Sequence, residues 1–226
     1  MKRGGNNAQK RRAGEAAADA VADGQVVGLG TGSTAAHAIR ALGRAVDAGR
    51  DVEGIPTSYQ SRELARKVGL PTTTLEEASP DLAIDGADQV VGSDLIKGGG
   101  AAHAREKLVD AAADRLLVVA DETKLAEALS VPVPVEVLPD AREPVADGVR
   151  ERGGEPTLRA AERKDGPVVT DNGNLVLDCE FGEIDDPAGL AADISALPGV
   201  LEHGLFVDMA DAIYVGTDEG ATVRES

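Results

Sequence analysis

The chain has 226 residues, and its 40 acidic against 23 basic side chains give a formal net charge of −17 at neutral pH. Nucleic acids and anionic membranes carry dense negative charge, so we expect neither as a partner. No apolar run approaches the roughly 20 residues of a membrane helix. The single cysteine, Cys179, has no partner in the chain, which is typical of a reducing compartment. We therefore expect a cytoplasmic protein.

The charge also suggests a salt requirement. Self-repulsion of this size destabilises a compact state unless salt screens it. Lysine is scarce, and the aromatic residues are two Tyr and two Phe. Our hypothesis is a halophilic-type acidic surface adapted to a salt-rich cytoplasm, and the alternative is an ordinary acidic protein.

The first part of the chain alternates predicted strands with predicted helices. Short apolar runs predict strands at 26–29, 52–55, 82–84 and 115–120. Helical spacing or an alanine-rich composition predicts helices at 13–22, 35–48, 61–68 and 101–113. Such alternation is typical of an α/β fold in which helices cover both faces of a mostly parallel, Rossmann-like sheet.

The pattern changes after residue 131. The segments 133–139, 142–152, 157–160, 168–178, 188–197 and 200–205 predict the order β-α-β-β-α-β of a split βαβ, ferredoxin-like unit. The prolines of the first strand suit a sheet edge, and Asn172-Gly173 predicts a hairpin turn. A last strand at 212–216 could return to the first sheet. The expected division is a Rossmann-like catalytic domain at 1–130 plus 206–226, and an inserted α+β lobe at 131–205.

A loop rich in glycine and hydroxyl side chains follows the first strand. Glycines let the backbone approach an anion, and the next helix offers free N–H groups. The candidate phosphate-binding residues are Thr31, Gly32, Ser33 and Thr34. Neither the dinucleotide fingerprint nor a Walker motif is present. The alternative is a tight turn with a capping hydroxyl.

A second candidate segment is Asp85-Gly86-Ala87-Asp88, which follows the strand at 82–84. In open α/β sheets, ligands bind beyond the carboxyl ends of the strands. Two carboxylates three residues apart could therefore face one ligand. A polar turn is the alternative, because Asp and Gly are common in turns.

The third segment is Lys97-Gly98-Gly99-Gly100, followed by Glu106 in a predicted helix. Three consecutive glycines lose much conformational entropy on folding, which makes sense if their amides must line a ligand. Lys97 would present a cation. Glu106 would either act on a ligand or be an ordinary surface residue paired with a neighbouring base.

Together these groups suit proton transfer beside the carbonyl of a phosphorylated sugar. A carboxylate base moves the proton between two carbons, and positive groups stabilise the enediolate. The three histidines are scattered, and we expect neither a metal nor a cofactor. We interpret Cys179 as structural.

These segments resemble the signatures of type A ribose-5-phosphate isomerases. The resemblance includes Gly30 to Thr34, Asp85 to Asp88, and Lys97 to Gly100 with Arg105-Glu106-Lys107. It continues through Val118 to Asp121 with Lys124, Pro134 to Val137, Val169 to Asn174, Leu197 to Val200 and Gly204 to Phe206. It covers nearly the whole chain after Lys10, in the right order. It implies an enzyme of the non-oxidative pentose phosphate pathway that interconverts ribose 5-phosphate and ribulose 5-phosphate, and a homodimer or homotetramer.

The resemblance also implies catalytic roles. Glu106 corresponds to the family's general base, and Lys97 would stabilise the enediolate. Asp85 and Asp88 would handle ring opening and hydroxyl protons, with Gly86 and Ala87 beside them in the substrate site.

Binding roles follow in the same way. Thr31 to Thr34 would bind the phosphate end or adjoining hydroxyls, and Gly98 to Gly100 would contact the ligand. Lys124 matches a further substrate-binding lysine, and Lys10 occupies the place of an N-terminal lysine near the phosphate. The alternatives are a related sugar-phosphate deaminase or lactonase, and a non-catalytic sugar-phosphate sensor.

Overall fold

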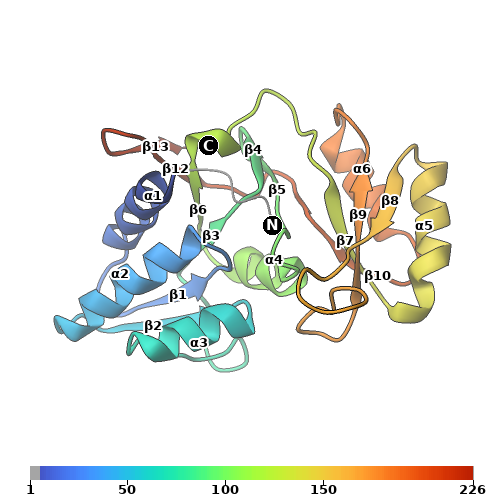
Figure 1. Ribbon diagram of the computed structural model, residues 1–226. Helices are drawn as coiled ribbons and strands as arrows, with labels where there is room; N and C mark the ends of the chain where they lie inside the picture. Colours follow the sequence, from blue (N-terminus) through green and yellow to red (C-terminus); the bar gives the residue numbers. More distant parts are fainter. Residues whose placement is uncertain (1–5, 226) are drawn as a thin grey trace. The chain divides into compact units, whose positions relative to one another are not determined.

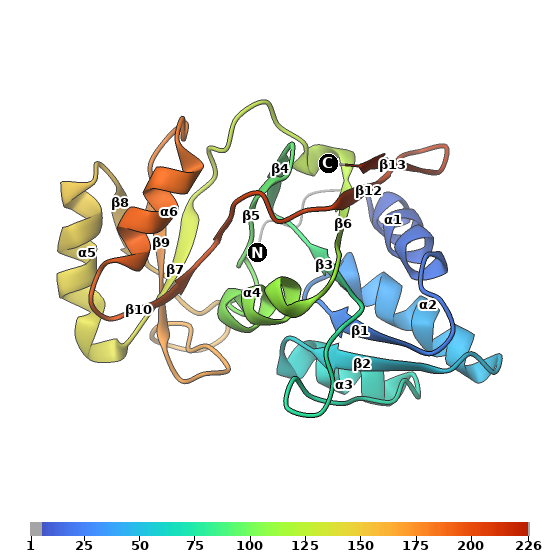
Figure 2. The same ribbon diagram turned by 180° about the vertical axis from the view of Figure 1, so that it is seen from behind.

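The structure of the protein is a computed structural model that describes residues 6–225. The chain forms two compact units. Unit 1 comprises the described parts of Met1–Ala87, Arg105–Leu125 and Met209–Ser226, and unit 2 comprises Asp88–Ala104 and Ala126–Asp208. Figures 1 and 2 label their helices and strands.

Unit 1 contains a six-stranded sheet in the order β13-β12-β6-β3-β1-β2. Its strands are β1 (Gln25–Leu29), β2 (Val52–Pro56), β3 (Leu82–Gly86), β6 (Leu116–Asp121), β12 (Ala212–Gly216) and β13 (Ala221–Glu225). All neighbours are parallel except β12 and β13. The predicted mostly parallel sheet is therefore confirmed, and the strand after residue 211 does return to it beside β6. Sequence analysis did not predict β13.

Helices cover both faces of this sheet (Figures 1 and 2). They are α1 (Asn7–Asp19), α2 (Ala35–Asp47), α3 (Tyr59–Lys67) and α4 (His103–Ala112). The first three share one hydrophobic core with Val27 and Leu29 of β1. Gly28 points to the other face, where a Cβ would lie 2.8 Å from a methyl of Val109 in α4. Successive residues of β1 thus face the two helical layers in turn.

The start of α1 differs from the prediction. The alanine-rich run predicted a helix from residue 13, but the helix begins at Asn7, because the side chain of Asn6 caps it by accepting the N–H of Ala8 at 2.9 Å. The backbone of Gln9 then packs against the end of β12. A Cβ on Gly216 would lie 1.8 Å from the backbone carbonyl oxygen of Gln9. A cap and a tertiary contact therefore extend the helix through a polar segment.

Unit 2 contains a four-stranded antiparallel sheet in the order β10-β7-β9-β8. Its strands are β7 (Val133–Val137), β8 (Glu155–Leu158), β9 (Leu175–Glu180) and β10 (Val200–His203), and its helices are α5 (Arg142–Glu151), preceded by η2 (Pro139–Ala141), and α6 (Pro187–Ser195). This confirms the predicted β-α-β-β-α-β order. Valines of β7 form a core with residues of α5 and α6.

Two details of this lobe correct the prediction. β7 lies inside the sheet, between β10 and β9, and not at an edge. Pro134 lacks an N–H, but its carbonyl still accepts the N–H of Gly204 at 2.7 Å, so the proline costs the sheet one donor only. The first arm of the predicted hairpin is limited to a bridge between Val169 and Leu175, and β9 pairs instead with β7 and β8.

A second sheet of unit 2 has the order β11-β5-β4 and was not predicted. Its strands are β4 (Gln89–Val91), β5 (Asp94–Ile96) and β11 (Leu205–Phe206). The predicted division placed residues 88–104 in the catalytic domain, whereas here they belong to unit 2, because β5 pairs with β11. Periodicity does not reveal strands this short.

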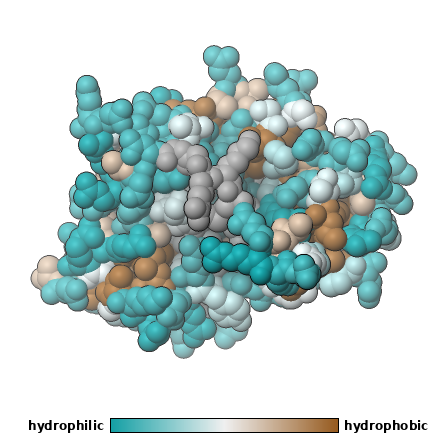
Figure 3. All heavy atoms as spheres, in the orientation of Figure 1, coloured by the Kyte–Doolittle hydropathy of each residue, from teal (hydrophilic) through white to brown (hydrophobic). Residues whose placement is uncertain are grey.

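Hydrophilic residues cover most of the face drawn in Figure 3, and hydrophobic ones form smaller patches. Among the described residues, no helix is both long and apolar enough to cross a membrane.

Candidate active site

The carboxyl ends of three neighbouring strands of unit 1 carry predicted site residues. Leu29 of β1 lies beside Ile84 of β3, and Gly86 of β3 lies beside Val119 of β6. Because these strands are parallel, the loop from Gly30, the Asp85 carboxylate and the turn after β6 follow at one edge of the sheet. Open α/β sheets bind ligands at this end, beyond the carboxyl ends of their strands.

Asp85 is held tightly against the loop after β1. Its side chain is 1% exposed, and Oδ1 accepts the N–H groups of Thr31 at 3.1 Å and Gly86 at 2.6 Å. A Cβ on Gly30 would lie 2.1 Å from the same Oδ1. Only glycine at position 30 therefore lets the loop approach the carboxylate so closely.

The hydroxyl of Thr31 belongs to a cluster that sequence reasoning missed. Its Oγ1 lies 2.9 Å from Thr57 Oγ1 and donates to Ser58 Oγ at 2.6 Å. Thr57 in turn donates to the carbonyl of Leu29 at 3.0 Å, and Ser58 forms a capping box with Ser61 at the start of α3. The position of Thr57 and Ser58 directly after β2 is the signal that could have identified them.

The rest of the loop leads into α2. Gly32 has a φ of +117°, which strongly favours glycine. Ser33 is exposed, and Thr34 is buried at the N-cap position of α2. The Thr34 side chain makes no capping hydrogen bond among the described residues. Within residues 6–225, Thr34 thus stands at the N-cap position of α2 without capping the helix through its side chain.

The turn after β6 holds Lys124 in a 3-10 helix, η1 (Glu122–Lys124). Asp121, to which the sequence analysis assigned no role, begins this turn, and its Oδ1 accepts the N–H of Thr123 at 3.0 Å. Gln9 donates to Glu122 Oε2 at 2.9 Å. The start of α1, which includes the half-buried Lys10, is thereby attached to η1.

Glu106 lies in the first turn of α4 and is 3% exposed. Its neighbour Arg105 is exposed, so the two side chains lie on different sides of the helix. The alternative of a solvated surface glutamate is therefore wrong. A carboxylate is costly to bury, and such groups cluster at functional sites.

In unit 2, Asp88 holds the glycine loop that follows β5. The backbone N–H of Asp88 donates to Ile96 O at 2.7 Å, and its Oδ2 accepts the N–H of Gly99 at 2.7 Å. Gly98 has a φ of +102°, and a Cβ there would lie 2.8 Å from Nδ1 of the buried His103. Glycine at position 98 is thus required by both backbone conformation and packing.

Lys97 is 2% exposed, which is unusual for a lysine. Its N–H donates to Gly204 O at 2.9 Å, and its Nζ lies 5.0 Å from the centroid of the Phe206 ring, within range of a cation–π interaction. Phe206 stands on β11, the strand paired with β5. This pairing, absent from any local pattern, determines what surrounds the lysine.

No group of three His, Cys, Asp or Glu side chains suited to a metal ion occurs between residues 6 and 225. Cys179 is buried, and burial, with a smaller effect of the Asp178 charge, raises the pKa of its thiol to about 12. A cavity of about 630 Å³ opens in unit 1 between α3, residues 72–77 and α4, and none of the predicted site residues lines it.

The structure thus assembles the candidate residues in two groups. Unit 1 holds buried carboxylates (Asp85 and Glu106), a hydroxyl-rich loop and Lys124; unit 2 holds Asp88, Lys97 and the glycine loop. Carboxylates can move protons, whereas a buried cation and backbone amides can stabilise an oxyanion. These are the groups needed for acid–base chemistry on an anionic substrate.

Comparison with known proteins gives one consistent result. A family described as "Ribose 5-phosphate isomerase A (phosphoriboisomerase A)" matches residues 53–220. The chain is 73% identical over 221 residues to "Ribose-5-phosphate isomerase A" of Natronomonas pharaonis, covering 98% of each chain, and 70% identical over 224 residues to the protein of the same name from Haloarcula marismortui, covering 99% of this chain and 98% of the other.

Solved structures agree with this. Ribose 5-phosphate isomerase A from Methanocaldococcus jannaschii is 44% identical, covers 98% of this chain and 100% of its own, and has a TM-score of 0.94. A D-ribose-5-phosphate isomerase in complex with phospho-erythronic acid is 41% identical, covers 96% and 98%, and also has a TM-score of 0.94.

Proposed function

Because this chain belongs to the ribose 5-phosphate isomerase A family, we propose that it interconverts ribose 5-phosphate and ribulose 5-phosphate. The observation that carries the proposal is the burial of Glu106 and Asp85 in a chain that matches such isomerases along nearly its whole length. Burying a carboxylate is costly, and ionisable groups in such environments cluster at functional sites. The reaction needs them for proton transfer.

The central step assigns Glu106 as the general base. In the open-chain aldose, the Glu106 carboxylate removes the proton from C2. The electron pair of that C–H bond forms the C1–C2 double bond, and the electrons of the C1 carbonyl move onto O1 to give an enediolate. The same group, now protonated, returns the proton to C1, while the proton of the C2 hydroxyl passes to O1 and the C2 oxygen becomes the ketose carbonyl. Substrate and product are isomers, so the net reaction needs no external oxidant or reductant. Such groups contribute about 10²–10⁴-fold to rates.

The other residues support this transfer. Lys97 stabilises the negative oxygen of the enediolate. A buried cation stabilises such a charge more effectively than a cation in water does. Asp85 and Asp88 exchange protons with the sugar hydroxyls and assist ring opening, and Gly86 and Ala87 lie between them in the chain. The amides of Gly98 to Gly100 contact the substrate.

The phosphate end is assigned to the groups at the sheet edge of unit 1. Thr31 to Thr34 supply N–H and hydroxyl donors, and Lys124 supplies charge; Lys10 is proposed as a further phosphate contact because α1 is attached to η1. Phospho-erythronic acid, held by one relative, suits this scheme. Its phosphate matches that of the substrate. Its carboxylate carries a negative charge on two neighbouring oxygens, and in this it is an analogue of the enediolate.

The test is direct. Purified protein should convert ribose 5-phosphate to ribulose 5-phosphate in molar potassium chloride with a chelator present. The Glu106→Gln variant should lose about 10²–10⁴-fold in kcat while still binding phospho-erythronic acid. Glu219→Gln, an exposed residue of unit 1, is the matched control. A folded wild-type protein without turnover would refute the function, and an active Glu106→Gln would remove Glu106 from its role.

Three expectations from the sequence remain proposals. We propose a homodimer or homotetramer that works in the cytoplasm and needs salt because of its net charge of −17. Mass measurement in solution tests the assembly. Unfolding temperature and activity should both rise with potassium chloride, since salt screens self-repulsion. Full activity and stability in dilute buffer would refute the salt requirement.

A further inference from the structure

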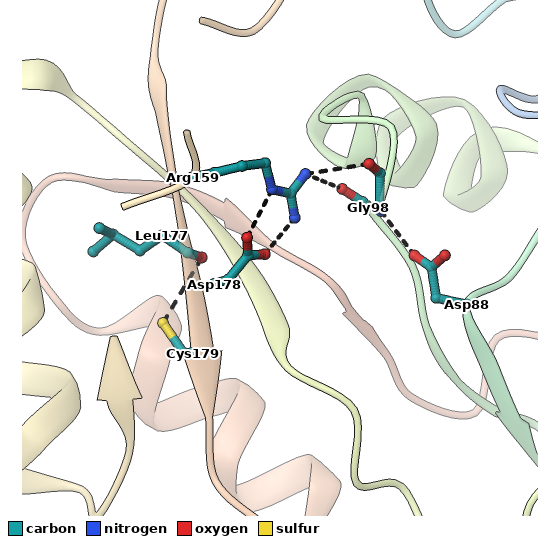
Figure 4. Close-up of polar contacts among 7 residues, drawn as sticks. Asp88, Gly98, Arg159, Leu177, Asp178 and Cys179 are labelled. Atoms are coloured by element: carbon teal, nitrogen blue, oxygen red, sulfur yellow. Dashed lines mark hydrogen bonds and ion pairs between the residues drawn. The ribbon is translucent and has the colours of Figure 1, made fainter. Parts of the chain in front are cut away.

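One arginine contacts the glycine loop of unit 2. Arg159 follows β8, and its Nη1 donates to the carbonyl of Gly98 at 2.8 Å and, at a longer 3.4 Å, to that of Gly99 (Figure 4). Its side chain is 15% exposed. Neither the sequence patterns nor the roles proposed above include this residue. Its Nη1 faces the backbone of the loop.

The position of Arg159 is fixed from its other side. Nε donates to Asp178 Oδ2 at 2.9 Å, and Nη2 donates to Asp178 Oδ1, so that the guanidinium and carboxylate form a bidentate pair (Figure 4). This planar pairing gives directional precision as well as energy. The backbone of Arg159 is also held, because its N–H donates to Val176 O at 2.9 Å and its carbonyl accepts the N–H of Val168 at 2.8 Å.

The loop connects this pair to a proposed catalytic carboxylate. The carbonyl of Gly98 and the N–H of Gly99 belong to one planar peptide group. The carbonyl accepts from Arg159, and the N–H donates to Asp88 Oδ2 at 2.7 Å (Figure 4). Because the peptide is rigid, Arg159 fixes the direction of the N–H that holds Asp88. A cation at the carbonyl also polarises the peptide and strengthens the N–H as a donor.

We propose that Arg159, locked by Asp178, is a positioning residue for the isomerase reaction, which it serves by orienting the 98–99 peptide and, through it, the carboxylate of Asp88. Arg159 does not touch the substrate in this scheme. The inference rests on the proposed function for its kinetic consequence, whereas the contacts that it describes do not depend on that function.

The main test is Arg159→Ala, with Arg150→Ala as the control, because Arg150 also pairs with an aspartate of unit 2 at 2.7 Å but contacts no part of the loop. We expect Arg159→Ala to lower kcat roughly 10- to 100-fold, the rate equivalent of losing a hydrogen bond to a charged group. KM for ribose 5-phosphate should change less, by no more than about threefold, since the groups assigned to the phosphate end belong to unit 1 and are untouched. The control should behave as wild type.

Three further measurements separate positioning from a structural role. Millimolar guanidinium ion should restore part of the lost rate in Arg159→Ala, because Asp178 can hold it, and should not help Glu106→Gln. Asp178→Asn keeps the arginine but loosens it, so it should lose less activity than Arg159→Ala. Hydrogen exchange of the amides at 98–100 should be faster in Arg159→Ala, and this readout does not require turnover.

The outcomes are distinguishable. If wild type does not isomerise ribose 5-phosphate, the proposed function fails, and hydrogen exchange alone decides whether Arg159 holds the loop. If wild type is active and Arg159→Ala has an unchanged kcat, or if its amides at 98–100 exchange as in wild type, the positioning role is refuted. A loss that guanidinium does not restore, together with a wild-type Asp178→Asn, would also overturn it.

Discussion

Replacing Gly30 by alanine tests how closely the loop after β1 is held against Asp85. A Cβ built on Gly30 would lie 2.1 Å from Asp85 Oδ1, 2.3 Å from its Cγ and 2.6 Å from its Cα. Carbon atoms pack best at about 3.5–4.0 Å, so the two segments would have to separate by roughly 1 Å. Rotation of the Asp85 side chain relieves the first two contacts but not the third, which is to the backbone.

The expected cost follows from this overlap. Overpacking in a tightly packed region costs about 1–3 kcal/mol of unfolding free energy, which for a chain of this size lowers Tm by roughly 2–12 °C. Separation also lengthens the hydrogen bonds from Thr31 and Gly86 to Oδ1. Losing one bond to a charged acceptor should reduce kcat/KM about 10-fold or more.

Calorimetry and the isomerase assay, run in the same salt, measure both effects. Gly220→Ala is the matched control, since its Cβ would meet nothing within 4 Å and its φ is not positive; it should leave Tm and kcat/KM near wild type. If Gly30→Ala matches that control in both quantities, the contact between the loop and Asp85 is not as close as described, and the reasoning is refuted.

Three other predictions concern buried polar groups. Lys97→Met should lower kcat roughly 10²–10³-fold, as loss of an oxyanion-stabilising group does, and an unchanged kcat would exclude that role. Glu136, fully buried in β7, accepts hydrogen bonds at Oε1 from Thr170, Asn172 and Asn174; Glu136→Gln should lower the unfolding free energy by about 1–3 kcal/mol in denaturant titrations, and equal midpoints would contradict this. Burial raises the pKa of Cys179 to about 12 from 9.0, so the native thiol should resist a thiol reagent at pH 8 and react once unfolded. Because the folded pKa is the higher one, this contribution to stability is complete below pH 9 and is lost as pH rises toward about 12.

Local patterns predicted the elements that depend on local physics. A glycine-rich loop separates β1 from α2, as predicted, whereas α3 begins two residues before its predicted start, because Ser58 caps it. Apolar runs identified β3 and β6 because each is buried throughout or nearly so. The strands β4, β5 and β11 were missed, because two- or three-residue strands carry too few side chains for a period and exist only through pairing with one another.

By itself, the sequence determined the alternation of strands and helices, the motifs and their order, because spacing along the chain is enough to place Asp85 at a strand end and Glu106 near a helix start. The tertiary structure alone decided which side chains hold them. Thr57 reaches Thr31, and Arg159 reaches the carbonyl of Gly98 across 61 positions of sequence. Such contacts arise from strand pairing and burial, which join segments far apart in the chain, and no local pattern of residue types records them.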